Sequence, residues 1–523
     1  MLSFRLGASS WRTLSVAACM LAGVSLTWAM PVSVAGATGP VGVVGPTGQS
    51  ASMAKLDGPL NSPLSASLDP AQKAVLARIG ARTWKFFEAD VNTSTNLPMD
   101  NVSLVGGAAS GAYTSPTDIG VYMWGVTAAR DLHLVSAPKA EQLVAATLTA
   151  ASKLRNWNGF LLSWYDTNTG QAITGPGGTA LGGGSLDGQF ISTVDNAWYA
   201  NSLVVVRQAY PQLAPLATKM LNAMNFAILY DSAALSSSTN AGQMYGGYVV
   251  GQGPTGWTYG LLNTETRIAA YMGIGTQTVP GTVWWRTFRT LPASLTWQTQ
   301  TPQGSYVTYR DPQSGQQFKV FEGHYNFAGV KFVPSWGGSE FEGLMNSMVV
   351  PETSWGPNSF GLNDRNYAVA SIAYASSVLH YPVWGLSPAS TPDNTGGYAA
   401  YGVPALSSNA GCCPYQTGAV TPYASFLALS VIPKRAYANI SAMRSDFPQV
   451  YGPMGYFDSL NPTSGQVAQR YLVLDQAMVM AGIDVVLNNG GLQHYFARDA
   501  VGRAVRPYLA MEHFSIAPSA LGK

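Results

Sequence analysis

The chain has 523 residues and a nearly balanced charge, with 28 Lys and Arg residues against 26 Asp and Glu residues. A net charge of +2 without a basic run excludes nucleic acid and anionic membrane surfaces as expected partners. Only 10% of the residues are charged, whereas 14 Trp, 26 Tyr and 18 Phe residues are present. Exposed Tyr and Trp suit carbohydrate binding, although most aromatic residues of a large protein pack in its core.

The first 37 residues read as an export signal. Arg5 and Arg12 supply a positive start, residues 14–29 form an apolar run, and Ala35-Gly36-Ala37 resembles a cleavage site. The apolar run is too short for a stable membrane insertion. We therefore expect an exported protein that resides in the periplasm or outside the cell.

A linker follows the export signal. Glycine recurs at every third position from Gly36 to Gly48, but this stretch is far too short for a collagen-like triple helix. Residues 38–70 are rich in Gly, Pro, Ser and Ala, which is typical of a linker. Residues 71–515 then form one domain, which we expect to be monomeric.

Cysteine and histidine do not indicate a metal or cofactor site. Cys412 and Cys413 are adjacent and form either a vicinal disulfide or two free thiols. The five histidines show no His-Glu-x-x-His spacing, and no Gly-x-Ser-x-Gly elbow or phosphate loop is present. We predict no zinc-type metal and no cofactor.

Helical periodicity dominates the rest of the chain. Apolar residues from Val75 to Phe87 share one face of a helix predicted at 71–90, and Ser115-Pro116-Thr117 begins the next helix. Paired helices with loops at one end favour an all-α toroid with short β-hairpins, although propensity alone does not separate it from another large helical fold. Further helices are predicted at 138–156, 193–209, 212–230, 262–274, 340–349, 364–379, 422–430, 434–445 and 470–488, and hairpins near 159–173 and 304–320.

The stretch from Ser335 to Glu342 places two carboxylates among aromatic residues and glycines. Desolvation in such surroundings raises the pKa of an acid, and a carboxyl that stays protonated can act as a general acid. The structural alternative is a helix cap, because Ser339 followed by Glu342 fits a capping box. The local spacing alone favours the cap.

An ordered series of motifs resembles known glucan-active proteins. One set resembles the glucoamylase-like central region of cyclic β-1,2-glucan synthases, and a C-terminal set resembles secreted endo-β-1,2-glucanases. The resemblance implies an (α/α)6 barrel that acts on β-1,2-glucan or a neighbouring polysaccharide. The first set comprises residues 81–87, 96–101, 114–120, 128–131, 164–167, 192–196 and 335–342, and the second comprises 384–387, 397–404, 451–458 and 471–476.

The resemblance implies roles for three acids. Glu265 matches a glutamate that both groups carry and is the candidate proton donor. Glu342 matches the nucleophile of a retaining transglycosylation in the synthases, whereas Asp475 matches the base of an inverting hydrolysis in the glucanases. A separation of about 5–5.5 Å between the two catalytic carboxyl groups favours retention of the anomeric configuration, and about 6.5–9.5 Å favours inversion. Leu474-Asp475-Gln476 resembles the glucanase motif, whereas the synthases have His-His-Gln at this place. The resemblance to the glucanase motif favours hydrolysis.

Each of these acids has a structural alternative. Glu265 can pair with Arg267 or cap the helix predicted at 262–274. Asp475 lies in an otherwise apolar helix, where Arg470 or a backbone amide can satisfy it. Both alternatives remain open at this point.

Further residues are candidates for substrate binding. Asp118 and Asp195 follow helix starts, so each either stabilises a helix dipole or binds a sugar hydroxyl. Glu340 points away from Glu342 if the segment is helical, and is expected behind it. Single aromatic residues more often pack in the core than bind sugars. The candidate sugar platforms are Trp164, Trp336, Trp384, Tyr398 and Tyr401.

The sequence therefore predicts an exported glycoside hydrolase that cleaves a β-glucan, and the resemblance favours β-1,2-glucan. One alternative is a retaining transglycosylase on the same substrate. A second alternative is a glycan-binding protein without catalytic activity.

Overall fold

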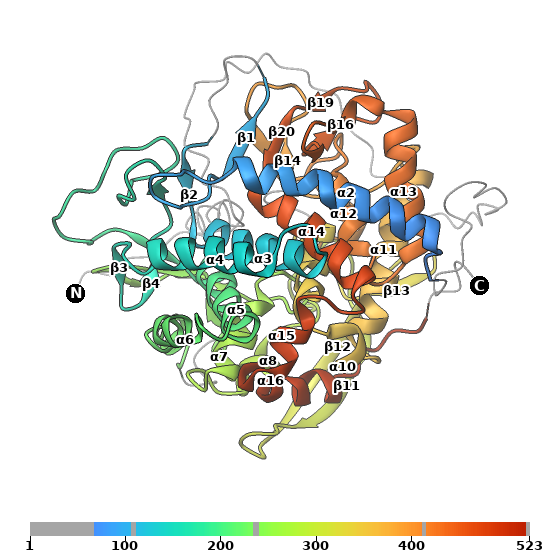
Figure 1. Ribbon diagram of the computed structural model, residues 1–523. Helices are drawn as coiled ribbons and strands as arrows, with labels where there is room; N and C mark the ends of the chain where they lie inside the picture. Colours follow the sequence, from blue (N-terminus) through green and yellow to red (C-terminus); the bar gives the residue numbers. More distant parts are fainter. Residues whose placement is uncertain (1–66, 106–110, 234–239, 410–414, 519–523) are drawn as a thin grey trace, which may run out of the picture.

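The computed structural model describes residues 67–105, 111–233, 240–409 and 415–518 (Figure 1). The predicted export signal, nearly all of the predicted linker and the Cys412–Cys413 pair lie outside the described residues. Within the described ranges, no helix has the length and apolar character needed to cross a membrane.

Helices make up the body of the molecule, as the periodicity predicts. Most are linked by loops that carry short strands. The helices are α2 (Pro70–Ala89), α3 (Pro116–Asp131), α4 (Ala137–Ala151), α5 (Thr193–Ala209), α6 (Ala214–Asn222), α7 (Arg267–Gly275), α8 (Thr282–Arg286), α9 (Glu340–Leu344), α10 (Glu352–Trp355), α11 (Phe360–Ser377), α12 (Pro422–Ala428), α13 (Pro433–Asp446), α14 (Val473–Leu487), α15 (Gln493–Arg498) and α16 (Ala500–Met511), with 3₁₀ turns η2 (Phe226–Leu229), η3 (Met345–Met348), η4 (Pro404–Leu406) and η5 (Pro448–Val450).

The strands form small antiparallel sheets, each of two or three strands. The longest pair, β11 and β12, projects from the helical body as a hairpin (Figure 1). The strands are β1 (Asn101–Ser103), β2 (Tyr113–Thr114), β3 (Asn156–Trp157), β4 (Phe160–Leu161), β5 (Tyr165–Asp166), β6 (Phe190–Ser192), β7 (Met244–Tyr245), β8 (Gly247–Val249), β9 (Gly253–Pro254), β10 (Thr258–Tyr259), β11 (Gln303–Arg310), β12 (Gln317–Phe327), β13 (Val330–Phe332), β14 (Ala389–Ser390), β15 (Tyr398–Ala399), β16 (Tyr451–Gly452), β17 (Gly455–Tyr456), β18 (Ser459–Leu460), β19 (Val467–Ala468) and β20 (Arg470–Leu472).

An inner set of helices forms the core. Helix α3 packs against α5 and α14, α5 packs against α7, and α12 packs against α14 and α9. Helices α3 and α14 bury residues on every face because other elements surround them. Helices α2, α4, α6 and α13 lie outside this set, against α14, α3, α5 and α12 respectively, and bury fewer of their residues. The described helices thus form an inner and an outer layer.

Acidic residues gather at the N-terminal ends of the inner helices. Asp118 forms a capping box with Ser115 at the start of α3, and Asp195 lies in the first turn of α5. Glu342 forms a capping box at the start of α9, and Asp475 lies in the first turn of α14. Carboxylates are stabilised there by the positive end of the helix dipole.

Several predicted elements differ from the structure. The helix predicted at 212–230 is interrupted after Asn222, and Asn225 instead accepts a hydrogen bond from Ala227 N–H to start η2. The helix predicted at 470–488 begins at Val473, because residues 470–472 form β20 and pair with β1. Backbone pairing over long sequence separations, which local periodicity does not reveal, accounts for β20.

The hairpin predicted near 304–320 is confirmed as β11 and β12. The hairpin predicted near 159–173 is only partly correct. Tyr165 forms the expected local bridge with Ala172, but β5 pairs with β2 across a long sequence separation, and β3 with β4 forms a further local hairpin.

Candidate active site

Glu265 lies in the turn between β10 and α7, not inside a helix as predicted, because α7 begins at Arg267. Asn346 Nδ2 donates a hydrogen bond of 3.1 Å to the backbone oxygen of Glu265. Arg267 Nη1 donates to Thr264 O at 2.9 Å and to Glu342 O at 3.2 Å. One guanidinium therefore connects the turn that contains Glu265 to the helix that carries Glu342.

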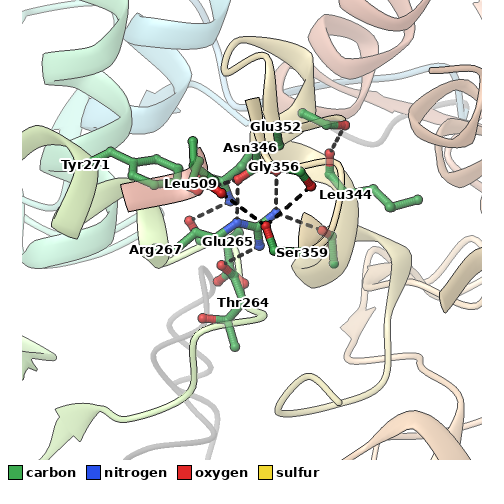
Figure 2. Close-up of polar contacts among 12 residues, drawn as sticks. Thr264, Glu265, Arg267, Tyr271, Leu344, Asn346, Glu352, Gly356, Ser359 and Leu509 are labelled. Carbon is green, nitrogen blue, oxygen red and sulfur yellow. Dashed lines mark hydrogen bonds and ion pairs between the residues drawn. The ribbon is translucent and has the colours of Figure 1, made fainter. Parts of the chain in front are cut away.

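The charge of Arg267 is neutralised by Glu352 rather than by Glu265. Arg267 Nε and Nη2 donate to the two oxygens of Glu352 at 2.7 Å, and both side chains are fully buried. Tyr271 Oη adds a hydrogen bond of 2.6 Å to the same carboxylate (Figure 2). The alternative in which Glu265 serves as the partner of Arg267 is thus not what the structure shows.

Glu265 is placed to hold a proton. The side chain is only 3% exposed, and burial, followed by the negative charge of Glu342, raises its pKa to about 8. Desolvation and a like charge both disfavour the ionised form of a carboxyl. Glu265 is therefore protonated at neutral pH, as a general acid must be.

Glu342 has the opposite environment, because several donors converge on its carboxylate. Ser335 Oγ donates at 2.9 Å, Gly337 N–H at 2.8 Å, and Ser339 N–H at 3.0 Å and Oγ at 2.9 Å. Burial raises its pKa, and these hydrogen bonds oppose the shift. The capping box that the sequence suggested is present, and its donors favour the ionised form of Glu342 against the larger effect of burial.

The turn before α9 depends on Gly338. Its φ is +81°, and a Cβ atom built there would lie 2.1 Å from the backbone oxygen of Val403. Only glycine adopts this conformation and allows this approach at low cost. Gly338 therefore sets the course of the loop that delivers N–H groups to Glu342.

Asp475 belongs to a second group of acids. The side chain is 2% exposed, and burial together with the charges of Asp458, Asp100 and Asp118 raises its pKa well above the usual range. Arg470 does not satisfy it, since Arg470 Nη1 donates to Gly396 O instead. Within the described ranges, no group of three or more His, Cys, Asp and Glu side chains is arranged to hold a metal ion.

Tyr398 is influenced by acids of both groups. Burial raises the pKa of Tyr398 well above its usual range, and the charges of Asp475, Asp458, Asp100 and Glu265 add to that shift. A hydrogen bond also joins the first turns of α3 and α5, because Thr117 Oγ1 donates to Asp195 at 2.6 Å. The structure thus brings the acids of distant segments to the same end of the inner helices.

The remaining predicted acids behave as helix residues. Asp118 accepts a hydrogen bond of 2.8 Å from Ser115 N–H, which is the capping alternative. Glu340 accepts from Ser371 Oγ and from Ser387 Oγ, and neither of these groups contacts Glu342. Burial raises the pKa of Glu340 to about 7. Glu340 therefore supports α9 from behind.

The predicted aromatic platforms fall into two kinds. Trp164 is partly buried against Tyr113, and Trp336 is partly buried in the loop that binds Glu342. Tyr398 is also partly buried. Trp384 and Tyr401 are 3% and 5% exposed and pack against buried apolar residues, so their role as sugar platforms stays a prediction.

Sequence reasoning missed three residues of this region. Trp297 is 42% exposed, and its ring lies 6.1 Å from that of Trp336 at 72°. No local pattern marks Trp297. Asp100 and Asp458 lie inside motifs that carry the family resemblance, which was a signal that could have nominated both of them.

A cavity of about 930 Å³ lies elsewhere, at the C-terminal ends of α3 and α14. None of the predicted site residues lines it. Its central cation, Arg130, already donates to Asp131 at 2.8 Å and to Tyr495 Oη at 2.5 Å. The cavity is therefore separate from the acids, and its principal charges pair with each other.

Two family models match the chain. Residues 262–500 match the Glycoamylase model, described as "Putative glucoamylase", and residues 78–259 match a family of unknown function, DUF3131. The first match contains Glu265, Glu342 and Asp475, and the second contains Asp118 and Asp195.

The chain is also similar to individual proteins. It is 22% identical over 526 residues to the cyclic β-(1,2)-glucan synthase NdvB of Rhizobium meliloti. The match covers 82% of this chain but only 18% of that relative.

Its fold is shared with two endo-β-1,2-glucanases of known structure. The enzyme of Chitinophaga pinensis has a TM-score of 0.62 at 14% identity, covering 85% of this chain and 98% of the other. The enzyme of Talaromyces funiculosus has a TM-score of 0.59 at 12% identity, covering 84% and 88%. The predicted resemblance is therefore confirmed: the chain is related to glucoamylase-like proteins and to a cyclic β-1,2-glucan synthase, and it has the fold of endo-β-1,2-glucanases.

Proposed function

We propose that this chain is a glycoside hydrolase that cleaves β-1,2-glucan, with Glu265 as the proton donor and Asp475 as the base. The observation that carries the proposal is the buried Glu265 carboxyl, whose pKa is raised to about 8 beside the hydrogen-bonded carboxylate of Glu342. A pair of carboxyls in different surroundings, one with few donors and one with many, is the usual pattern of an acid-catalysed glycosidase.

The proposed scaffold is an (α/α)6 toroid. We assign α3, α5, α7, α9, α12 and α14 to the inner ring, since these helices contact one another in that order and α14 returns to α3. The inner helices then present their N-terminal ends, and the acids on them, to one mouth. The fold shared with endo-β-1,2-glucanases supports this assignment.

The proposed reaction needs a proton at the leaving oxygen and a base for water. Glu265 donates its proton to the glycosidic oxygen while the bond to the anomeric carbon breaks. Water attacks that carbon from the opposite face and loses a proton to Asp475. The exposed face of Trp297, beside Trp336, offers a surface for a sugar ring.

A retaining transglycosylase is the second candidate. Glu342 contributes the largest charge effect on Glu265, so these two carboxyls lie near each other. A short separation favours attack by a carboxylate and a covalent glycosyl-enzyme intermediate. The similarity to a cyclic β-(1,2)-glucan synthase also supports a retaining transglycosylase.

The proposal is tested by measuring new reducing ends from β-1,2-, β-1,3- and β-1,4-linked glucans. We expect cleavage of the β-1,2-linked polymer, and Glu265→Gln should lower the rate by at least about 100-fold because general acid catalysis is lost. Glu88→Gln makes the same change on the exposed face of α2 and should leave the rate unchanged. Binding of glucan without cleavage by the wild-type protein would instead support a glycan-binding role.

The place of action is a proposal as well. If residues 1–37 are removed during export, the mature protein meets its glucan in the periplasm or outside the cell, as a monomer of one catalytic domain spanning 71–515. N-terminal sequencing of the exported protein would test the cleavage site, and light scattering would test the monomer.

A further inference from the structure

The hydrogen bonds to the carboxylate of Glu342 fall unequally on its two oxygens. Ser335 Oγ donates to Oε2 at 2.9 Å, and Ser339 N–H and Oγ donate to the same oxygen at 3.0 and 2.9 Å. Oε1 accepts from Gly337 N–H at 2.8 Å, and that N–H also lies 3.1 Å from Oε2. Each oxygen of an ionised carboxylate has roughly two lone-pair sites. Oε2 is therefore saturated, whereas Oε1 keeps the capacity to accept a further bond.

The hydroxyl of Ser335 is itself held by two further groups. Ser335 Oγ lies 2.6 Å from Tyr367 Oη and accepts a hydrogen bond of 2.8 Å from Gly338 N–H. A serine hydroxyl has one hydrogen and two acceptor sites, and an ionised carboxylate only accepts. When Glu342 is ionised, the hydrogen of Ser335 therefore points to Glu342, and Tyr367 must be the donor to Ser335. Hydrogen-bond donation thus runs from Tyr367 through Ser335 to Glu342.

Tyr367 is fixed in the core beneath this chain of donors. It lies on α11, which packs against α9, and it is 0% exposed. Its ring stands at 90° to that of Phe332 at 6.0 Å, and a Cβ atom built on Gly343 would lie 3.1 Å from the ring. Within the described residues, Ser335 is the hydrogen-bond partner that the structure gives its hydroxyl. Packing holds the ring of Tyr367, and its hydroxyl acts on Ser335.

The charges around Glu342 keep Tyr367 a donor. Burial, followed by the negative charge of Glu342, raises the pKa of Tyr367 well above its usual range, so the hydroxyl stays protonated. The titratable groups that face Glu342 are Tyr367 and, from the turn before α7, Glu265. Arg267 bonds to the backbone oxygen of Glu342. The donors that the structure gives the carboxylate itself are thus neutral hydroxyl and N–H groups.

We propose that Tyr367 is a positioning residue that acts through Ser335, so that the loop before α9 binds Oε2 of Glu342 and leaves Oε1 to the substrate. This inference rests on the proposed function. Oε1 accepts a sugar hydroxyl in the proposed hydrolysis, and it is the attacking atom in the retaining candidate. Tyr367 is fully buried and acts without touching the sugar.

The kinetic test is Tyr367→Phe, which removes one hydroxyl and keeps the ring. We expect kcat to fall by about fivefold or more while KM stays within about twofold, because a misdirected carboxylate costs most in the transition state. Tyr374→Phe is the matched control, since Tyr374 lies on the same helix and its ring packs against Phe327 at 5.5 Å. It should leave kcat unchanged. An unchanged kcat in Tyr367→Phe would overturn the proposal.

A double-variant cycle separates the action through Ser335 from packing. Ser335→Ala removes the hydroxyl through which Tyr367 acts, so adding Tyr367→Phe to it should lower kcat no further. The same loss from Tyr367→Phe in the wild-type and Ser335→Ala backgrounds would show that Tyr367 acts by packing alone, and would contradict the proposal.

A second readout does not depend on turnover. Both substitutions remove the same buried hydrogen bond, so in urea unfolding the double variant should lose clearly less stability than the sum of the single losses. Tyr374→Phe should instead add to Ser335→Ala. Additive losses for Tyr367→Phe and Ser335→Ala would refute the bond. If the wild-type protein cleaves no β-1,2-glucan yet this cycle is non-additive, the link from Tyr367 to Ser335 stands and the proposed hydrolysis fails.

Discussion

At the scale of single residues, Glu265 and Glu342 show how one site separates two similar side chains. Both glutamates are 3% exposed. Glu342 accepts hydrogen bonds from Ser335, Gly337 and Ser339, whereas the side chain of Glu265 accepts one from its own backbone. Donors favour the ionised form of Glu342, whereas burial, followed by the negative charge of Glu342, raises the pKa of Glu265.

This pairing predicts the alkaline side of the activity profile. The proton donor must be protonated, so kcat/KM should fall as pH rises past about 8, the raised pKa of Glu265. Glu342→Gln removes a negative charge, which should lower that pKa and move the alkaline limb to lower pH. The measurement is the pH dependence of kcat/KM for the wild-type protein and Glu342→Gln, with the surface change Glu88→Gln as the control.

Two outcomes would contradict this prediction. A limb that stays in place in Glu342→Gln would show that Glu342 does not act on the proton donor. Complete loss of activity in Glu342→Gln, at every pH, would favour Glu342 as the nucleophile of the retaining candidate.

At the scale of secondary structure, Arg267 connects two elements that carry the chemistry. Its guanidinium donates to Thr264 O, Glu342 O and Gly343 O as well as to Glu352. The planar fork of arginine supplies several donors in fixed directions, which lysine cannot replace. The first turn of α7 and the start of α9 therefore keep their separation through this one side chain.

Arg267→Ala should strongly destabilise the protein. It leaves Glu352 buried without its partner, and breaking a buried ion pair costs about 3–5 kcal/mol. Arg267→Lys keeps the positive charge but loses several hydrogen bonds to backbone oxygens. It should therefore lower kcat clearly while changing Tm less than Arg267→Ala does. Urea unfolding and steady-state kinetics measure the two effects, and an unchanged unfolding free energy for Arg267→Ala would refute the structural role.

The helix starts were largely predictable from sequence, whereas the turn at Glu265 was not. Ser115 and Ser339 precede acids at capping-box spacing, and both caps are present. The periodic residues near 262–274 predict a helix through Glu265, but the structure begins α7 at Arg267. The hydrogen bond from Asn346, 81 residues further along the chain, helps to hold this turn, and local pattern carries no signal for it.

The acids of the site could be predicted only through the family resemblance. Glu265, Glu342 and Asp475 were nominated because ordered motifs resemble glucan-active proteins, not because of their spacing. Asp458 stands in one of those motifs as well, but the hydrogen bond that Ser390 N–H donates to it at 2.6 Å joins segments far apart in the sequence. Such contacts between distant segments become visible only in three dimensions.

At the scale of the whole molecule, the fold brings acids from distant parts of the chain to one end of the inner helices. The same fold occurs in endo-β-1,2-glucanases that match nearly their full length, whereas the chain spans 18% of the cyclic β-(1,2)-glucan synthase that it resembles. The likeness to the glucanases shows the fold, and hydrolysis is our proposal from the acids of the site.

The most direct test of this account is proton NMR of β-1,2-glucan during the first minutes after the protein is added. Inverting hydrolysis with Glu265 as acid and Asp475 as base predicts that new reducing ends appear first as the α-anomer, and that Glu265→Gln produces none on this timescale. A first product in the β-anomeric form would support retention through Glu342. An unchanged spectrum with the wild-type protein, or equal product from Glu265→Gln, would contradict the central claim.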